Sequence, residues 1–204
     1  MQIVGFILLG YLSGSVLYAR IFARLFGKEN MLERSRDKNP GTANAFMYGG
    51  FWCGLLTLLC DIGKGFLPVF FFLRIGGELR ASVLATSLVI AAPVVGHVFP
   101  LFYQLRGGKG IATTFGSLLG LFPVLKPSLI LAVFFLFFSL ILRVSPHFYR
   151  TLMAYVCALF YMSWKIEWQA VTIGFAVITL VICIRMLAST EEREKMKVTL
   201  LWMH

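Results

Sequence analysis

A lysine enclosed by glycines is the strongest candidate for chemistry in this sequence. Arg106, Gly107, Gly108, Lys109 and Gly110 are followed directly by an apolar, helix-compatible run. Glycines let a backbone approach a ligand closely, and successive amides can form a nest for an anion. The N-terminus of the following helix favours the same anion, and Lys109 adds a point charge suited to phosphate. The residues alone leave two interpretations open: a phosphate-binding loop, without the G-x-x-x-x-G-K-[ST] spacing of a Walker loop, or a tight interhelical turn with a basic flank.

A second polar segment lies upstream, between the first two apolar runs. Asn39, Gly41, Thr42 and Asn44 supply neutral hydrogen-bond donors and acceptors beside a turn at Pro40. These groups could contact a substrate. Alternatively, Asn44 caps the helix that follows it. The residues alone leave both interpretations open.

Polar residues inside the apolar runs form a third group. Asp61 and Lys64 are three residues apart, so they lie on one face of a helix. Charges are costly in lipid, so both should face the bundle interior, and we favour a structural ion pair over direct catalysis. Ser15 belongs to a Ser-Gly-Ser motif that suits close helix packing. His97 approaches the glycine loop, where either a ligand contact or a structural role is open.

Membrane helices have to position these groups. The 204 residues are 59% hydrophobic and 14% charged, against roughly 45–50% and about 25% in soluble domains. Continuous apolar runs favour helices, which pair their own backbone groups in lipid. We predict an all-α polytopic membrane protein, a bundle of about seven transmembrane helices in a single domain, residues 1–204, with the first span retained. The expected spans are 3–26, 49–73, 81–103, 111–125, 127–143, 150–164 and 169–187.

Basic residues predict how this bundle sits in the membrane. Fourteen lysines and arginines fall on one side of the seven spans and four on the other, with Lys64 inside a span. Excess Lys and Arg mark cytoplasmic loops, so we predict the N-terminus outside, the C-terminus in the cytoplasm and both polar loops on the cytoplasmic face. The net charge of +10 then needs no nucleic-acid partner. The fourteen residues are Arg20, Arg24, Lys28, Arg34, Arg36, Lys38, Arg106, Lys109, Arg143, Arg150, Arg185, Arg193, Lys195 and Lys197.

The order and spacing of the motifs resemble a known enzyme family. From about residue 10 to residue 150, the chain is similar to the bacterial acyl-phosphate:glycerol-3-phosphate acyltransferases, the Y-type membrane enzymes of phosphatidate synthesis. The matching motifs are Leu12-Ser13-Gly14-Ser15, Asn39-Pro40-Gly41-Thr42-Ala43-Asn44, Asp61-Ile62-Gly63-Lys64-Gly65, Gly96-His97-Val98-Phe99-Pro100, Gly107-Gly108-Lys109-Gly110 and Val144-Ser145.

The resemblance implies a role in phospholipid synthesis in the bacterial cell membrane. The family moves a fatty acyl group from acyl-phosphate to the 1-hydroxyl of glycerol-3-phosphate and forms lysophosphatidate, without coenzyme A, another cofactor or a metal. Acyl-phosphate, glycerol-3-phosphate and membrane lipid are the expected partners; the oligomeric state is not predicted. The resemblance implies catalytic roles for Lys109, His97 and Asn44. It implies substrate contacts for Asn39, Gly41, Thr42, Arg106, Gly107, Gly108, Gly110, Ser15 and Ser145.

Several positions depart from the family pattern. Asp37 stands where the family has a serine, although Ser35 lies close by, and Met47 stands where it has an arginine. The family's His-Arg-x-Asn stretch is replaced by a run that begins at Arg185, and the only later histidine is His204. An acyltransferase is therefore weighed against a catalytically silent or acceptor-switched member that binds lipid or phosphate. A transporter of an anionic lipid is a third hypothesis, favoured by the charges inside the second span but opposed by the lack of an inverted repeat.

Overall fold

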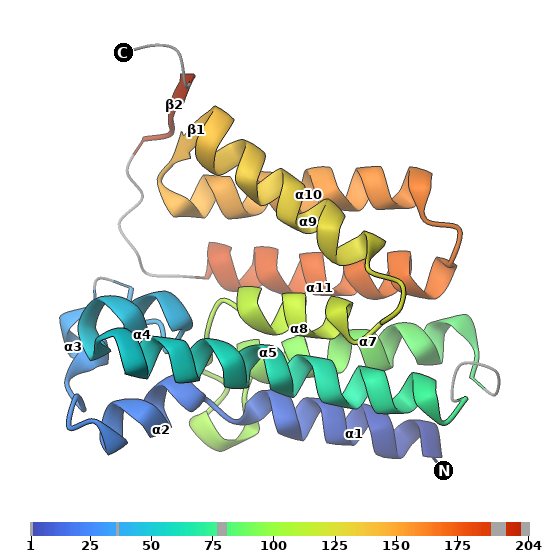
Figure 1. Ribbon diagram of the computed structural model, residues 1–204, viewed down its shortest axis with the longest axis horizontal. Coiled ribbons are helices and arrows are strands. Elements are labelled where there is room, and N and C mark those ends of the chain that lie inside the picture. Colours follow the sequence, from blue (N-terminus) through green and yellow to red (C-terminus); the bar gives the residue numbers. More distant parts are fainter. Residues whose placement is uncertain (1, 36, 77–80, 189–194, 201–204) are drawn as a thin grey trace.

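Helices make up most of the computed structural model, which describes residues 2–35, 37–76, 81–188 and 195–200 (Figure 1). The two short strands, β1 and β2, form a small sheet at one end of the bundle (Figure 1). In chain order the elements are α1 (Gln2–Ser15), α2 (Tyr18–Leu25), α3 (Met31–Arg34), α4 (Thr42–Gly49), α5 (Phe51–Arg74), α7 (Val83–Val98), the 3-10 turn η1 (Leu101–Tyr103), α8 (Ile111–Leu119), α9 (Lys126–Leu136), the π turn η2 (Phe137–Ile141), β1 (Leu142–Ser145), α10 (His147–Lys165), α11 (Gln169–Leu187) and β2 (Lys197–Leu200).

Each predicted span contains a helix, and the predicted all-α polytopic fold is confirmed. In the described part of the chain, four stretches are long and apolar enough to cross a bilayer. α8 has only nine residues, which is about 14 Å of helix, against a hydrocarbon layer of roughly 30 Å. The helix in the fourth expected span is too short to cross alone, so the count of seven stays a prediction. The four stretches are Gln2–Leu25, Phe51–Arg74, Val83–Tyr103 and Gln169–Leu187.

The first expected span is not one continuous helix. α1 ends at Ser15 and α2 begins at Tyr18. Lys64 Nζ, on α5, donates a hydrogen bond to the carbonyl oxygen of Val16 in this break at 2.6 Å. A backbone group freed inside a membrane helix needs such a partner. Because the partner lies 48 residues away, the local sequence contains no signal for the break.

Small residues let α1 cross α7 closely, as the Ser-Gly-Ser motif predicted. A Cβ atom on Gly14 would collide with the backbone of Pro93. The Ser15 hydroxyl donates to the Tyr11 carbonyl at 2.8 Å and accepts from the Leu101 amide at 3.2 Å. α1 thereby holds η1, the turn that precedes the glycine loop.

An apolar core joins α10 and α11 to the rest of the bundle. Tyr155 of α10 stacks on Phe175 of α11, with ring centroids 5.6 Å apart and planes inclined by 6°. Both side chains are fully buried. Aromatic pairs of this size contribute large buried areas and fix the relative positions of helices. The packing sets where the first residue of α10 and the last turn of α11 lie.

The two-stranded sheet was not predicted. β1 pairs antiparallel with β2, with Leu142 opposite Leu200 and Ser145 opposite Lys197. The expected span 127–143 therefore ends as helix at Ile141, and its last two residues belong to β1. The apolar run gives no sign of this change, because the strand depends on a partner far away in the chain.

The polar connections gather at one end of the bundle. Figure 1 shows α2 to α4, the start of α8, the start of α10 and the end of α11 at this end, with the N-terminus at the opposite one. At that opposite end, Lys126 Nζ donates to the carbonyl of Lys165 at 3.0 Å. The predicted grouping of the basic loops is thus present in space, whereas the side of the membrane stays a prediction. Of the counted charges, Arg36, Arg80 and Arg193 lie outside the described residues.

Candidate functional site

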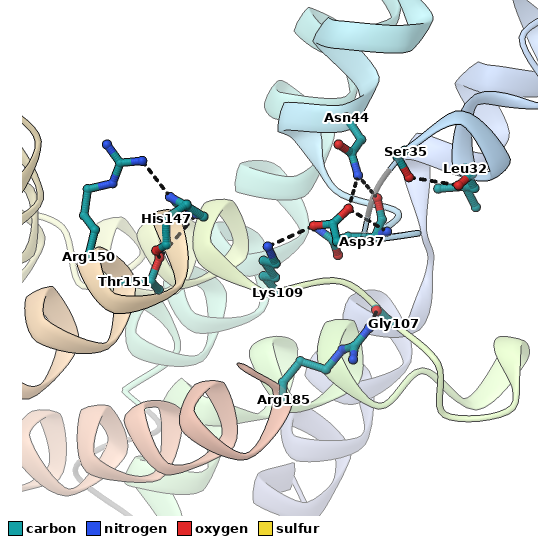
Figure 2. Close-up of polar contacts among 11 residues, drawn as sticks. Leu32, Ser35, Asp37, Asn44, Gly107, Lys109, His147, Arg150, Thr151 and Arg185 are labelled. Atoms are coloured by element: carbon teal, nitrogen blue, oxygen red, sulfur yellow. Dashed lines mark hydrogen bonds and ion pairs between the residues drawn. The ribbon is translucent and has the colours of Figure 1, made fainter. Parts of the chain in front are cut away.

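An ion pair between the two polar loops is the centre of the candidate site (Figure 2). Lys109 Nζ lies 2.9 Å from Asp37 Oδ2, and each side chain is 12% exposed. Lys109 is the predicted phosphate contact, and Asp37 stands where the family resemblance predicts a serine. The structure thus places a carboxylate of the chain itself beside the cation that we expected to hold a phosphate.

The segment around Asp37 is held by an asparagine from the next helix. Asn44 Nδ2 donates to Asp37 Oδ1 at 2.7 Å and to the Asn39 carbonyl at 2.8 Å, and the Asn39 amide donates to Asp37 Oδ1 at 3.2 Å. Burial alone would raise the pKa of Asp37, but hydrogen bonds and charge from Lys109 and Asn44 outweigh burial and hold it below its usual range. Asp37 is therefore ionised at neutral pH.

Asn44 is not the helix cap that one interpretation expected. α4 begins at Thr42 with Gly41 in the capping position, so Asn44 lies in the first turn of the helix. Its buried side chain faces Asp37 (Figure 2). Asn39 is buried as well, and its Oδ1 atom has no hydrogen-bond partner in the described structure. The hydrogen bonds from Asn39 and Asn44 thus hold Asp37 in place.

The glycine loop turns as predicted, but two of its amides are already used. The Gly107 amide donates to the Val98 carbonyl and the Gly108 amide to the His97 carbonyl, both at 3.1 Å. An anion nest across these glycines, as the sequence suggested, would have to break both bonds. Gly110 has a φ of 77°, a left-handed conformation that glycine adopts without strain, and α8 starts immediately after it. The backbone contribution to an anion site would then come from the first turn of α8, because a helix N-terminus favours an anion.

His97 lies directly beneath the glycine loop. It is 3% exposed, and a Cβ atom on Gly108 would collide with its Nε2 atom. On its other side, His97 Nδ1 is 3.8 Å from Asp61 Oδ1. The imidazole therefore connects the loop to the buried charges of α5.

The expected pairing of Asp61 and Lys64 is seen directly. Lys64 Nζ lies 2.8 Å from Asp61 Oδ1, and the two side chains are 1% and 2% exposed. Lys64 also donates to the Val16 carbonyl at 2.6 Å. The pair joins α5 to the break between α1 and α2, which is a structural use of both charges.

An arginine that we did not single out as a site residue reaches the glycine loop from α11. Arg185 Nη2 donates to the Gly107 carbonyl at 2.9 Å (Figure 2). The side chain is partly buried, and its Nε atom has no partner in the described structure. The only signal in the sequence was the position of Arg185 at the family's C-terminal motif.

The first turn of α10 supplies a second group that was not predicted. Arg150 Nη2 donates to His147 Nδ1 at 3.2 Å, so the ring proton is on Nε2, which lies 3.2 Å from Thr151 Oγ1. Burial and the positive charges of Lys109 and Arg150 lower the pKa of His147 to about 4. The imidazole is therefore neutral at pH 7. In Figure 2, His147 lies on the side of Lys109 that is away from Asp37.

Other expected site residues lie outside this cluster. Ser15 is fully buried and uses its hydroxyl to join α1 to η1. Ser145 and Arg106 are exposed, on β1 and in the loop after η1. Met47, at the family's arginine position, is 65% exposed. Ser35 cannot readily replace the family's serine, because its buried hydroxyl donates to the Leu32 carbonyl at 2.9 Å.

The arrangement is suited to binding an anion. Lys109 and Arg185 carry positive charges at the glycine loop, and Asp37 carries one negative charge beside Lys109. Arg150 adds a positive charge on the far side of His147 (Figure 2). Arginine and lysine are the side chains that bind phosphate most strongly. The neutral imidazole of His147 can exchange hydrogen bonds without adding charge.

Comparisons with known proteins identify the family of this chain. A family model described as glycerol-3-phosphate acyltransferase matches residues 4–197. A glycerol-3-phosphate acyltransferase of Pseudomonas paraeruginosa is 41% identical over 125 residues, which are 61% of this chain and 62% of that protein. One of Legionella pneumophila is 42% identical over 113 residues, covering 55% and 39%. The matched region thus spans less than two thirds of these relatives.

A solved structure has the same fold. It is the crystal structure of PlsY, an integral membrane glycerol 3-phosphate acyltransferase, in its glycerol 3-phosphate form. The TM-score is 0.75 at 24% sequence identity, and the alignment covers 91% of this chain and 88% of PlsY. Because the family model matches nearly the whole sequence, the chain belongs to the glycerol-3-phosphate acyltransferase family.

Proposed function

We propose that this protein transfers a fatty acyl group from acyl-phosphate to glycerol-3-phosphate and releases lysophosphatidate. The observation that carries the proposal is the meeting of three distant segments at the glycine loop. Asp37 pairs with Lys109, and Arg185 at the end of α11 donates a hydrogen bond to the Gly107 carbonyl. Lys109 and Arg185, the two cations at the glycine loop, suit a phosphate-bearing substrate. Membership of the family supports the acyl transfer and the acceptor, because its relatives are named glycerol-3-phosphate acyltransferase.

The proposed reaction asks for positioning and charge stabilisation. Acyl-phosphate is already activated, so the acceptor hydroxyl has to be aligned with the acyl carbon while developing negative charge is stabilised. The hydroxyl oxygen forms a bond to that carbon, and the bond from carbon to phosphate oxygen breaks. Phosphate leaves with the electron pair and takes up the proton that the hydroxyl loses. Lys109 and the first turn of α8 would bind a phosphate group, because the helix N-terminus favours an anion.

Asn44 and His97 act as positioning residues in this proposal. The amide of Asn44 is used by Asp37 and Asn39, so it orients the loop that holds Lys109. His97 is buried under Gly108 and supports the glycine loop from below. Both roles are indirect, in contrast to the catalytic contacts that the family resemblance implied.

The site is proposed to face the cytoplasm of a bacterial cell. The support is the excess of Lys and Arg at this end of the bundle. Cysteines replacing Lys38 or Arg106, both exposed, are tested one at a time in a background without the four native cysteines. They should resist a membrane-impermeant thiol reagent in intact cells and react after lysis. Ready labelling in intact cells would overturn the orientation.

A catalytically silent or acceptor-switched protein is the second candidate. It is favoured by the Asp37 carboxylate, which occupies Lys109, and by the exposed Met47 at the family's arginine position. In this case the site still binds an anion, but glycerol-3-phosphate is not acylated.

Turnover in a defined membrane separates the two candidates. The purified chain in nanodiscs is given acyl-phosphate and glycerol-3-phosphate, and lysophosphatidate is measured by mass spectrometry. The Lys109→Ala variant is the control for site-dependent product. Product that is lost in this variant supports the acyltransferase. Saturable binding of glycerol-3-phosphate without product supports the second candidate.

A further inference from the structure

The short helix α2 has two distinct faces at the polar end of the bundle. Ala19 and Ala23 pack inward with exposed fractions of 0% and 4%. Arg20 and Arg24 lie on the exposed side of the same helix. Spacings of three and four residues keep each set on its own face. α2 therefore presents two arginines to its surroundings at the end of the first apolar stretch.

These arginines border a groove of about 380 Å³ between α2, the segment before α3, and η1. The Arg20 guanidinium lies 5.3 Å from the centre of the Tyr103 ring, which holds it against η1. Arg24 Nε is 3.8 Å from Glu29 Oε1, and both of these side chains are more than two thirds exposed. None of the cations of the Lys109 cluster lines this groove. The lining residues are Arg20, Ile21, Ala23, Arg24, Leu25, Glu29, Leu32 and Tyr103.

Large apolar side chains are exposed on the same two segments, at the end of α2 and at η1 and the residues after it. Leu25 is 71% exposed and Phe26 43% at the end of α2, and Leu101, Phe102 and Leu105 are 55 to 59% exposed at η1. Both elements are the ends of stretches that are long and apolar enough to cross a bilayer. Exposed apolar residues beside arginines at such a position match the boundary between lipid head groups and acyl chains.

We propose that this groove binds the phosphate head group of an anionic membrane lipid. Arg20 and Arg24 contact the phosphate oxygens, since guanidinium groups pair with phosphate through two parallel hydrogen bonds. Leu25 and Phe26 contact the adjoining acyl chains. The long, exposed contact between Arg24 and Glu29 is a weak ion pair and yields to a phosphate. A soluble phosphate has no acyl chain to contact the exposed apolar side chains, whereas a lipid does. We therefore assign a lipid as the ligand.

The test measures which lipid stays with the protein. The full chain is reconstituted in nanodiscs of phosphatidylcholine with a minor fraction of phosphatidylglycerol, and retained lipids are quantified by native mass spectrometry. The double variant Arg20→Gln/Arg24→Gln should lose about tenfold in phosphatidylglycerol retention relative to phosphatidylcholine. Arg34→Gln, which removes an exposed charge from α3 outside the groove, should leave the preference unchanged.

Two further measurements keep the proposal falsifiable if the double variant folds poorly. In the unmodified chain, retention of phosphatidylglycerol should fall as salt is raised, since exposed charges are screened, while phosphatidylcholine is unaffected. Soluble glycerol phosphate should not displace the lipid at concentrations that saturate the Lys109 site. Equal retention of both lipids by the unmodified chain, an equal loss in Arg34→Gln, or displacement by soluble phosphate would each overturn the proposal. Because lipid retention is read without turnover, failure of the proposed acyltransferase activity leaves this test intact.

Discussion

Replacing Asp37 by asparagine should strengthen the binding of glycerol-3-phosphate. Asp37 Oδ2 lies 2.9 Å from Lys109 Nζ, and both side chains are largely buried. A phosphate that binds Lys109 must displace this carboxylate or lie beside it as a second anion. Asparagine keeps the shape of the side chain and an oxygen that can accept from Asn44 and from the Asn39 amide. The substitution therefore removes the competing charge and retains the loop.

The size of the effect follows from the strength of one charge-assisted contact. Such a hydrogen bond contributes roughly 1.5–3 kcal/mol net, which corresponds to about tenfold or more in Kd. We expect glycerol-3-phosphate to bind Asp37→Asn about tenfold more tightly than the unmodified chain. Asp37→Ser restores the family's residue and should act in the same direction, but less strongly, because it also loses the hydrogen bonds that hold the segment.

Equilibrium binding to protein in nanodiscs is the assay. The double variant Asp37→Asn/Lys109→Ala is the matched control, since removal of Asp37 should bring no gain once its cation is absent. Thermal unfolding verifies that each variant is folded. Unchanged or weaker binding by folded Asp37→Asn would show that the carboxylate does not compete with the ligand, and the interpretation of Lys109 as the phosphate contact would lose its main support.

Three other predictions concern the same end of the protein and its buried charges. Lys109→Ala should weaken binding of glycerol-3-phosphate about tenfold or more, with Lys109→Arg recovering only part because a planar fork does not replace a point charge; unchanged affinity in folded protein would leave Lys109 a structural residue. Asp61→Ala should lower the free energy of unfolding by about 3–5 kcal/mol, because it leaves the buried Lys64 without its carboxylate. The double variant Asp61→Ala/Lys64→Ala should therefore unfold at a higher temperature than Asp61→Ala. An equal or lower unfolding temperature in the double variant would contradict the pairing. Lowering the pH from about 6.5 to 4 should destabilise the protein by at most about 3 kcal/mol through His147, because the unfolded imidazole binds a proton that the folded one, with a pKa of about 4, does not. This part of the pH dependence of stability should be missing in His147→Gln. An identical pH profile in that variant would contradict the prediction.

Much of the fold was accessible from the sequence because membrane helices are specified locally. Backbone groups in lipid must pair within their own segment, so the length of an apolar run predicts a helix. The start of α8 after Gly110 and the pairing of Asp61 with Lys64 were likewise set by residues a few positions apart. The grouping of basic loops at one end followed from counting charges along the chain.

The departures from these expectations have long-range causes. The break between α1 and α2 depends on Lys64, which reaches Val16 from another helix. β1 depends on β2, and the amides of the glycine loop are taken by the end of α7. A local pattern holds no information about such partners.

Local patterns in the sequence were enough to predict a polytopic helical protein with a glycine-lysine loop and a nearby polar segment. The partners of these motifs depend on how the helices pack, which local patterns do not specify. Lys109 pairs with Asp37 across 72 residues of chain, and Arg185 reaches Gly107 across 78. His147 joins them because stacked aromatic rings hold α10 against α11. Charges that are distant in sequence meet only after helix packing has set the distances between them, and electrostatic energy depends on those distances.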